Sequence, residues 1–310
     1  MASGAHRIGI YLPQGGFGYD EILARARQCE ALGIETLWLM DHLHPPQMPD
    51  VPSFEGWTLA TALLSETTRL RVGHLVLSAT FRPPALLGKM ATSLDVISEG
   101  RLELGLGSGS YAPEHEAAGI PWGSARDRAR KLEESLEVVS AMFGRPARGP
   151  TRGLPVPSNV PPPVRAGGPA IHVGGVGERL ILPLVARYAD VWNCPTYGIA
   201  DFDAKREALR GHCERVGRDP GTLACSLEAV LVLVAADDEV DHARALAERR
   251  FGGPGWGLAE GGFVGTPETV VRRIHAFRER GVDSFIFFLH DRGGEETLRL
   301  LAERVLPAIQ

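Results

Sequence analysis

The chain has 310 residues and a formal net charge of −5, without long runs of like charge. This charge balance argues against nucleic acid or an anionic membrane as a partner, because both attract clustered lysine and arginine. No apolar run approaches the ~20 residues of a membrane-spanning helix, and no targeting segment is recognisable. We therefore expect a cytoplasmic protein that acts on a small molecule, built as one large α/β domain or as two smaller ones.

The four cysteines, Cys29, Cys194, Cys213 and Cys225, stand far apart in the sequence. None of them has a partner at C-x-x-C spacing, so the sequence predicts neither a zinc site nor a framework of disulfides. A reducing compartment fits this use of cysteine best.

Strands and helices alternate from the amino terminus onward. Residues 8–12 form a short apolar strand, and the helix that follows ends at Gly33. A second apolar strand, residues 36–40, ends at the polar pair Asp41-His42. The strand end therefore carries two side chains that are capable of acid–base chemistry.

The third predicted strand, residues 70–77, is apolar without alternation, so both of its faces should be buried. Strands of this kind occur in parallel sheets that helices cover, and ligands usually bind at their carboxyl ends. The next helix begins at Pro83-Pro84. We expect a substrate site just after Leu77.

The same order of strand and helix continues to the carboxyl terminus. The remaining predicted strands are residues 101–106, 171–174, 190–194, 223–235 and 284–289. Residues 145–169 and 251–262 are rich in proline and glycine and are predicted to be irregular loops. Eight strands separated by helices, with no dinucleotide-binding fingerprint after the first, favour a closed (β/α)8 TIM barrel with loop insertions over an open doubly wound sheet. We treat residues 1–310 as a single domain.

In a barrel, the residues that follow each strand converge at one face. Asp41-His42 is the best candidate there for proton transfer, because histidine exchanges protons near neutral pH and a neighbouring carboxylate can orient it. The alternative is that Asp41 caps a turn and His42 only packs. Their place at a strand end favours the functional interpretation.

Two glycine-rich turns could approach a ligand closely. The first consists of Gly174, Gly175, Val176 and Gly177, and the second of Gly107, Ser108 and Gly109. The first lies between a strand and a predicted helix, where free backbone N–H groups favour an anion such as a phosphate. Either turn could instead owe its glycines to backbone geometry alone. Two such turns in one barrel fit a large phosphorylated cofactor better than a small sugar or acid.

Three further side chains have two interpretations each. Glu114 and His115 either line the pocket or form a solvated pair in a polar loop. Arg82 either binds an acidic group of a substrate or cofactor or covers the barrel rim. The histidines show no H-x-H or H-E-x-x-H spacing, so no metal site is predicted.

Taken together, several segments resemble the bacterial luciferase-like oxidoreductases. They are LWLMDHL, GHLVLSATFRPPALLGKMATSLDVISEGRLELGLGSG, PEHEAAGIPW, IHVGGVGERLILPLVARYADVWN, GTPETVVRRI and GVDSFIFF. The resemblance extends over residues 8–307, nearly the whole chain. Within the superfamily, the chain is more similar to members that use the deazaflavin coenzyme F420 than to those that use flavin mononucleotide (FMN).

The resemblance implies a barrel with insertions and a deazaflavin or flavin that lies across the carboxyl ends of the strands. It implies a non-prolyl cis peptide between Leu75 and Val76, in a bulge that backs the ring. Asp41 and His42 match the family's polar pair beside the ring. The turn that begins at Gly107 matches the family's turn beside the ring, and the other glycine turn matches its phosphate-binding turn.

The activity implied is hydride transfer between F420 and a small organic substrate, with His42, held by Asp41, moving the accompanying proton. Ser110 stands where the sugar-phosphate dehydrogenase relatives carry an acidic residue, which argues against glucose 6-phosphate as the substrate. Two alternatives remain open: a two-component monooxygenase that uses FMN, and a non-catalytic barrel that stores the deazaflavin. Relatives are commonly dimers, which implies a homodimer.

Overall fold

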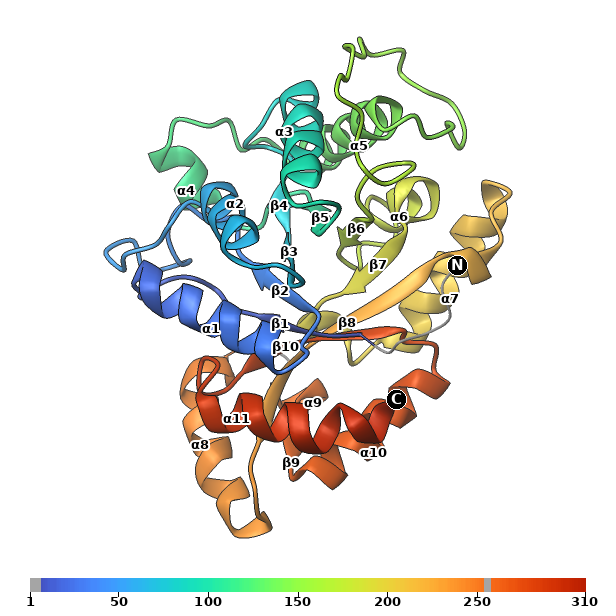
Figure 1. The fold of residues 1–310 in the computed structure, drawn as a ribbon. Helices are drawn as coiled ribbons and strands as arrows, with labels where there is room; N and C mark the ends of the chain where they lie inside the picture. Colours follow the sequence, from blue (N-terminus) through green and yellow to red (C-terminus); the bar gives the residue numbers. More distant parts are fainter. Residues whose placement is uncertain (1–6, 254–257) are drawn as a thin grey trace.

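A computed structural model describes residues 7–253 and 258–310, and its strands form one parallel sheet (Figure 1). The strands are β1 (Arg7–Tyr11), β2 (Thr36–Leu39), β3 (Arg71–His74), β4 (Leu77–Ser78), β5 (Leu102–Gly107), β6 (Ile171–Gly174), β7 (Val191–Cys194), β8 (Ala224–Leu233), β9 (Phe263–Gly265) and β10 (Ser284–Leu289). The sheet closes on itself because β10 pairs with both β1 and β8. The predicted (β/α)8 barrel is confirmed.

The structure differs from the predicted strands at two places. The strand predicted at 70–77 is divided into β3 and β4, which both pair with β5. The peptide bond between Leu75 and Val76, in the gap between them, is cis, as the resemblance implies. The short strand β9 was not predicted, and it pairs with the carboxyl-terminal end of β8, with Phe263 opposite Leu231.

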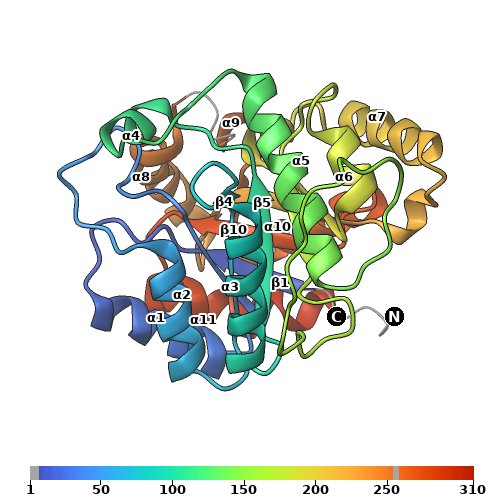
Figure 2. The ribbon, with the colours of Figure 1, turned by 90° about the horizontal axis from the view of Figure 1, so that it is seen from above.

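Helices surround the strands on the outside of the barrel (Figure 2). They are α1 (Tyr19–Ala31), α2 (Gly56–Glu66), α3 (Pro84–Ile97), α4 (Ala112–Ala117), α5 (Ala125–Met142), α6 (Leu182–Tyr188), α7 (Phe202–Arg215), α8 (Val240–Phe251), α9 (Leu258–Gly261), α10 (Pro267–Glu279) and α11 (Glu295–Leu300). Across the described ranges, none of these helices is long and apolar enough to cross a membrane.

Local sequence signals account for where the helices begin. Ser124 and Asp127 form a reciprocal capping box at α5, in which the Ser124 hydroxyl accepts from the Asp127 N–H at 3.2 Å and the Asp127 carboxylate accepts from the Ser124 N–H at 3.1 Å. A cap of this kind stabilises a helix by about 1 kcal/mol. Pro83 precedes α3 and Pro84 begins it, where a missing N–H costs nothing.

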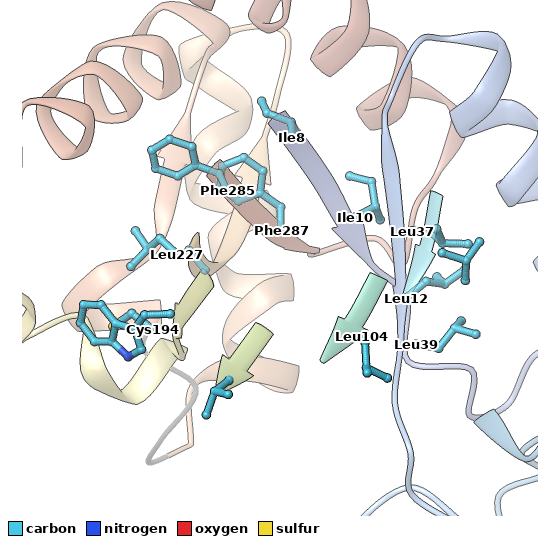
Figure 3. Close-up of a cluster of buried hydrophobic side chains, with 14 of the residues drawn as sticks. Ile8, Ile10, Leu12, Leu37, Leu39, Leu104, Cys194, Leu227, Phe285 and Phe287 are labelled. Atoms are coloured by element: carbon cyan, nitrogen blue, oxygen red, sulfur yellow. The ribbon is translucent and has the colours of Figure 1, made fainter. Parts of the chain in front are cut away.

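The alternation of side chains along β10 divides the core into two layers. Phe285 and Phe287 point outward into the layer between strands and helices, part of which Figure 3 shows together with Ile8 and Ile10 of β1. Ile286 and Phe288 point to the other side, into a smaller cluster that contains Tyr11 and Trp38 and extends to Phe251 of α8. Because successive strand residues face opposite sides, both faces of these strands are buried, as their continuous apolar runs predicted.

The two predicted irregular loops differ. Residues 145–169 contain no helix or strand, as predicted. The second, residues 251–262, contains the short helix α9, and its residues 254–257 lie outside the described part of the chain. A further short helix, α4, lies in the segment after the glycine turn at Gly107, and it carries Glu114 and His115 into the interior.

Candidate active site

A cleft of about 380 Å³ opens at the carboxyl ends of the barrel strands. Most of the predicted site residues line it: Asp41, His42, Leu75, Val76, Gly107, Ser108, Gly109, Gly174 and Gly175. Val176 and Gly177 are not among the lining residues. The barrel therefore brings together groups that are far apart in the sequence, as the prediction of one active face required.

His42 is paired with a glutamate from α4. The His42 Nδ1 lies 2.7 Å from the Glu114 Oε1, and the other carboxylate oxygen accepts the Leu43 N–H at 3.1 Å. The Glu114 side chain is only 2% exposed, whereas that of His42 is 23% exposed. Since a carboxylate only accepts, Nδ1 donates, and Nε2 remains without a partner among the described residues. This Nε2 is the atom that can give or take a proton in the cleft.

The prediction that Asp41 orients His42 is wrong. The Asp41 carboxylate instead forms a two-pronged ion pair with Arg82, with both N–O distances 2.8 Å, and it also accepts the Ser78 N–H at 2.8 Å. Arg82 Nη2, which donates to Asp41, also donates to the Glu55 carboxylate at 2.7 Å. Arg82 is thus neutralised by two carboxylates, which favours the rim interpretation over binding of an acidic ligand.

A chain of two hydroxyl groups links the end of β4 to a buried histidine, His115. Thr80 Oγ1 lies 2.6 Å from both Ser78 Oγ and His115 Nε2, and His115 Nδ1 lies 3.0 Å from the Tyr111 carbonyl. The carbonyl only accepts, so in a neutral ring Nδ1 donates and Nε2 accepts from Thr80. Thr80 then accepts from Ser78, which leaves the Ser78 oxygen as an acceptor toward the cleft. His115 is buried, so its interpretation as a solvated side chain is wrong.

The bulge explains several of the glycines. Val76 lies against Gly107 of β5 and Gly174 of β6, so closely that a Cβ atom at Gly174 would lie 3.1 Å from a Val76 methyl group. Gly109 adopts a φ of +82°, and a Cβ there would lie 2.8 Å from the Ser78 hydroxyl. These glycines make room for the bulge and the turn beside it, and Leu75 and Val76 line the cleft there.

The turn from Gly174 to Gly177 offers backbone donors without a helix terminus. Helix α6 begins only at Leu182, so the predicted helix start immediately after the glycines is wrong. The N–H groups of Val176 and Gly177 nevertheless donate to no acceptor among the described residues, whereas the Gly175 N–H donates to the Asn193 carbonyl at 3.2 Å. Two free amides in succession can bind an anion such as a phosphate.

The residues present fit the cofactor that the resemblance implies. Leu75 and Val76 provide an apolar surface for a ring, and Ser108 and Gly109 lie beside it. The free amides of the Gly174–Gly177 turn lie next to this cleft and suit a phosphate. Among the described residues, no group of three or more histidine, cysteine, aspartate or glutamate side chains is placed to hold a metal ion.

Glu228, on the long strand β8, also lines the cleft and was not predicted. Burial raises the pKa of its carboxyl group to about 8, and it has no hydrogen-bond or ion-pair partner among the described residues. When ionised, Glu228 acts electrostatically on Tyr11, Cys194 and Tyr197 and raises the pKa of each. The one signal in the sequence was a single acidic residue within an otherwise apolar strand.

Replacing Glu228 by glutamine should remove a pH-dependent loss of stability. From about pH 4.5 to 8 the folded chain keeps a proton on Glu228 that the unfolded chain releases, so the free energy of unfolding falls as pH rises. Glutamine is neutral at every pH. Thermal melts at pH 5 to 9 should show the variant gaining Tm over wild type up to about pH 8 and then levelling off. Glu214→Gln, at an exposed position, is the control. A Tm difference between Glu228→Gln and wild type that does not change with pH would show that the pKa of the Glu228 carboxyl group is not raised.

Comparison with known proteins gives one family and one fold. The model of the luciferase-like monooxygenase family matches residues 3–255. The F420-dependent hydroxymycolic acid dehydrogenase of Mycobacterium tuberculosis is 29% identical over 253 residues, which cover 79% of this chain and 67% of that protein. The chain spans between 38% and 67% of the lengths of the first three curated relatives that it matches.

Solved structures agree on the fold. An F420-dependent secondary alcohol dehydrogenase, in complex with an F420-acetone adduct, superposes with a TM-score of 0.80 at 17% identity, over 98% of this chain and 99% of the other. The oxygenating constituent of 3,6-diketocamphane monooxygenase from Pseudomonas putida, in complex with FMN, has a TM-score of 0.78 at 19% identity and covers 99% of both chains. Because the sequence identities are below 20%, these superpositions show that the barrel fold is shared and nothing about the reaction.

Proposed function

The chain belongs to the luciferase-like monooxygenase family, and from this membership we propose that it is an oxidoreductase that transfers a hydride between coenzyme F420 and a small organic substrate. The observation that carries the proposal is the His42–Glu114 pair, which lies in the same cleft as the Leu75-Val76 bulge and the glycine turns. The relative from Mycobacterium tuberculosis, named as an F420-dependent dehydrogenase, supports the choice of cofactor.

Each part of the cleft has a separate role in this proposal. The Leu75-Val76 surface and the turn at Gly107 hold the ring, and the free amides of Val176 and Gly177 bind the phosphate. When bound, the deazaflavin supplies the two-electron exchange. The walls of the cleft keep the ring in a fixed position and exclude water from it.

His42 acts as the general base or general acid for the proton that accompanies the hydride. Its Nε2 takes the proton from a substrate hydroxyl group, or gives one to a carbonyl oxygen, while Nδ1 stays bonded to Glu114. The buried carboxylate fixes which nitrogen carries the proton and stabilises the imidazolium ion that forms. Glu114 is therefore a positioning residue, and His42 is the group that touches the substrate.

Cofactor titration tests the proposal directly. We expect F420 to bind to the purified protein with quenching of its fluorescence, and FMN to bind at least about tenfold more weakly. Tight binding of FMN alone would instead identify a two-component flavin monooxygenase. Binding of F420 without any redox change across a broad panel of alcohols and ketones would identify a storage protein. We also propose a homodimer, which light scattering would test.

A further inference from the structure

A second cavity, of about 600 Å³, adjoins the cleft and shares Tyr11, His42, Pro46 and Phe288 with it. Its walls are mostly apolar and come from the segments after β1 and β2 and from the end of α8; Pro13, Met40, Val51 and Phe251 are examples. A cavity of this size holds a drug-sized organic molecule. Because His42 lines both spaces, a molecule in the second cavity can present a reacting group to this histidine.

Of the residues that the structure describes, three arginines and no acidic residue line this cavity: Arg249, Arg250 and Arg292. Arg250 donates to the His290 carbonyl at 2.8 Å, and Arg292 donates to the Gly15 carbonyl at 2.5 Å. Neutral carbonyl groups do not cancel the charge of a guanidinium group. Arg249 is exposed and has no partner in the described part of the chain.

The surroundings leave this positive charge largely uncompensated. None of the three arginines forms an ion pair with a described carboxylate, in contrast to Arg82, which pairs with two. Asp291 acts electrostatically on Arg250, and Glu21 acts on Arg292, but burial and a neighbouring arginine lower the pKa of both guanidinium groups. An anion at this end of the cavity would meet the guanidinium N–H groups of three arginines. Two of these side chains are held in place by backbone carbonyls, and Arg249 is not.

Resting on the function proposed above, we propose that the substrate is an amphipathic organic anion. Its apolar body lies in the second cavity, its carboxylate faces Arg249 and Arg250, and its reacting group lies at His42. The apolar mouth fits this occupant, since Met48 is 52% exposed there. A short sugar or a neutral alcohol would leave the arginines without a counter-charge.

A charge reversal on α8 tests the assignment without the cofactor. Decanoate and methyl decanoate serve as probes, and their binding to the purified protein is measured by calorimetry at low salt. We expect decanoate to bind wild type at least about tenfold more tightly than the ester, and Arg249→Glu to remove most of that preference. Arg244→Glu is the matched control, because Arg244 is exposed on the same helix but lines a different cavity.

Each other outcome overturns the inference. Equal affinity for acid and ester would show that the arginines do not select an anion, and equal losses in both variants would show only a general charge effect. No binding of either probe would mean that something else covers the cavity, such as a second copy of the chain. Weaker F420 binding in Arg249→Glu but not in Arg244→Glu would assign the arginines to an acidic part of the cofactor. Failure of wild type to bind F420 bears on the proposed function alone, because the probe assay contains no cofactor.

Discussion

Replacing His42 by alanine is expected to lower kcat by roughly 10²- to 10⁴-fold, the usual contribution of a positioned acid–base group. Cofactor affinity should stay within a few fold of wild type, because the ring is held by the Leu75-Val76 surface and the glycine turns rather than by the imidazole. Steady-state kinetics with F420 and an accepted substrate, together with a fluorescence titration of each variant, measure both quantities.

Two further variants separate chemistry from packing. His44→Ala is the control, because His44 lies in the same loop but its Nδ1 contacts only the Pro45 carbonyl and its side chain lines neither cavity. Glu114→Gln keeps the shape of the pair but removes the charge, so we expect a lower kcat and an altered pH profile with little change in KM. Full turnover in His42→Ala would remove this histidine from the mechanism.

Replacing Asp41 by alanine should lower the free energy of unfolding by about 3 to 5 kcal/mol. The Arg82 side chain is only 12% exposed, and Asp41 supplies its two-pronged partner as well as the acceptor for the Ser78 N–H. Removal of the carboxylate leaves a largely buried guanidinium group with Glu55 alone. Urea unfolding measures the loss, and the double variant Asp41→Ala, Arg82→Met should regain part of it, because it leaves no largely buried guanidinium group without its main partner.

This prediction also distinguishes the two roles considered for Asp41. If Asp41 served mainly to orient His42, Asp41→Ala would lower kcat without lowering stability. Glu55→Ala is the comparison variant, because it removes the other carboxylate that binds Arg82. Glu55 is 42% exposed and caps α2 through the Trp57 and Thr58 N–H groups, so its loss should cost only about 1 to 2 kcal/mol.

Most of the fold could be predicted because its signals are local. The strands expected at 171–174 and 284–289 are β6 and β10 with the same bounds, and α3 begins at Pro84 as predicted. Apolar strands buried on both faces, separated by helices, led to the barrel. The elements that were missed are short: α4 has six residues, α9 has four and β9 has three. Elements of this length carry too few residues to show a period.

The pairings in the site could not be predicted from neighbours in sequence. Asp41 and His42 are adjacent in the sequence, just after the end of β2, but they bind different partners. Asp41 binds Arg82, 41 residues away, and His42 binds Glu114, 72 residues away. Sequence proximity suggested a contact between the two, whereas each is paired with a side chain from a distant segment.

The sequence by itself determined the barrel, the strand ends that carry the candidate site residues and the position of the bulge. The reason is that hydrophobic periodicity, glycine-rich turns and the segments shared with the family are local features of the sequence. Only the tertiary structure decided which carboxylate binds His42. Within the described part of the chain, it also showed that Glu228 faces the cleft without a partner and that three arginines line the adjoining cavity. The physical reason is that charge pairing and burial depend on groups brought together by barrel closure, which local spacing does not encode.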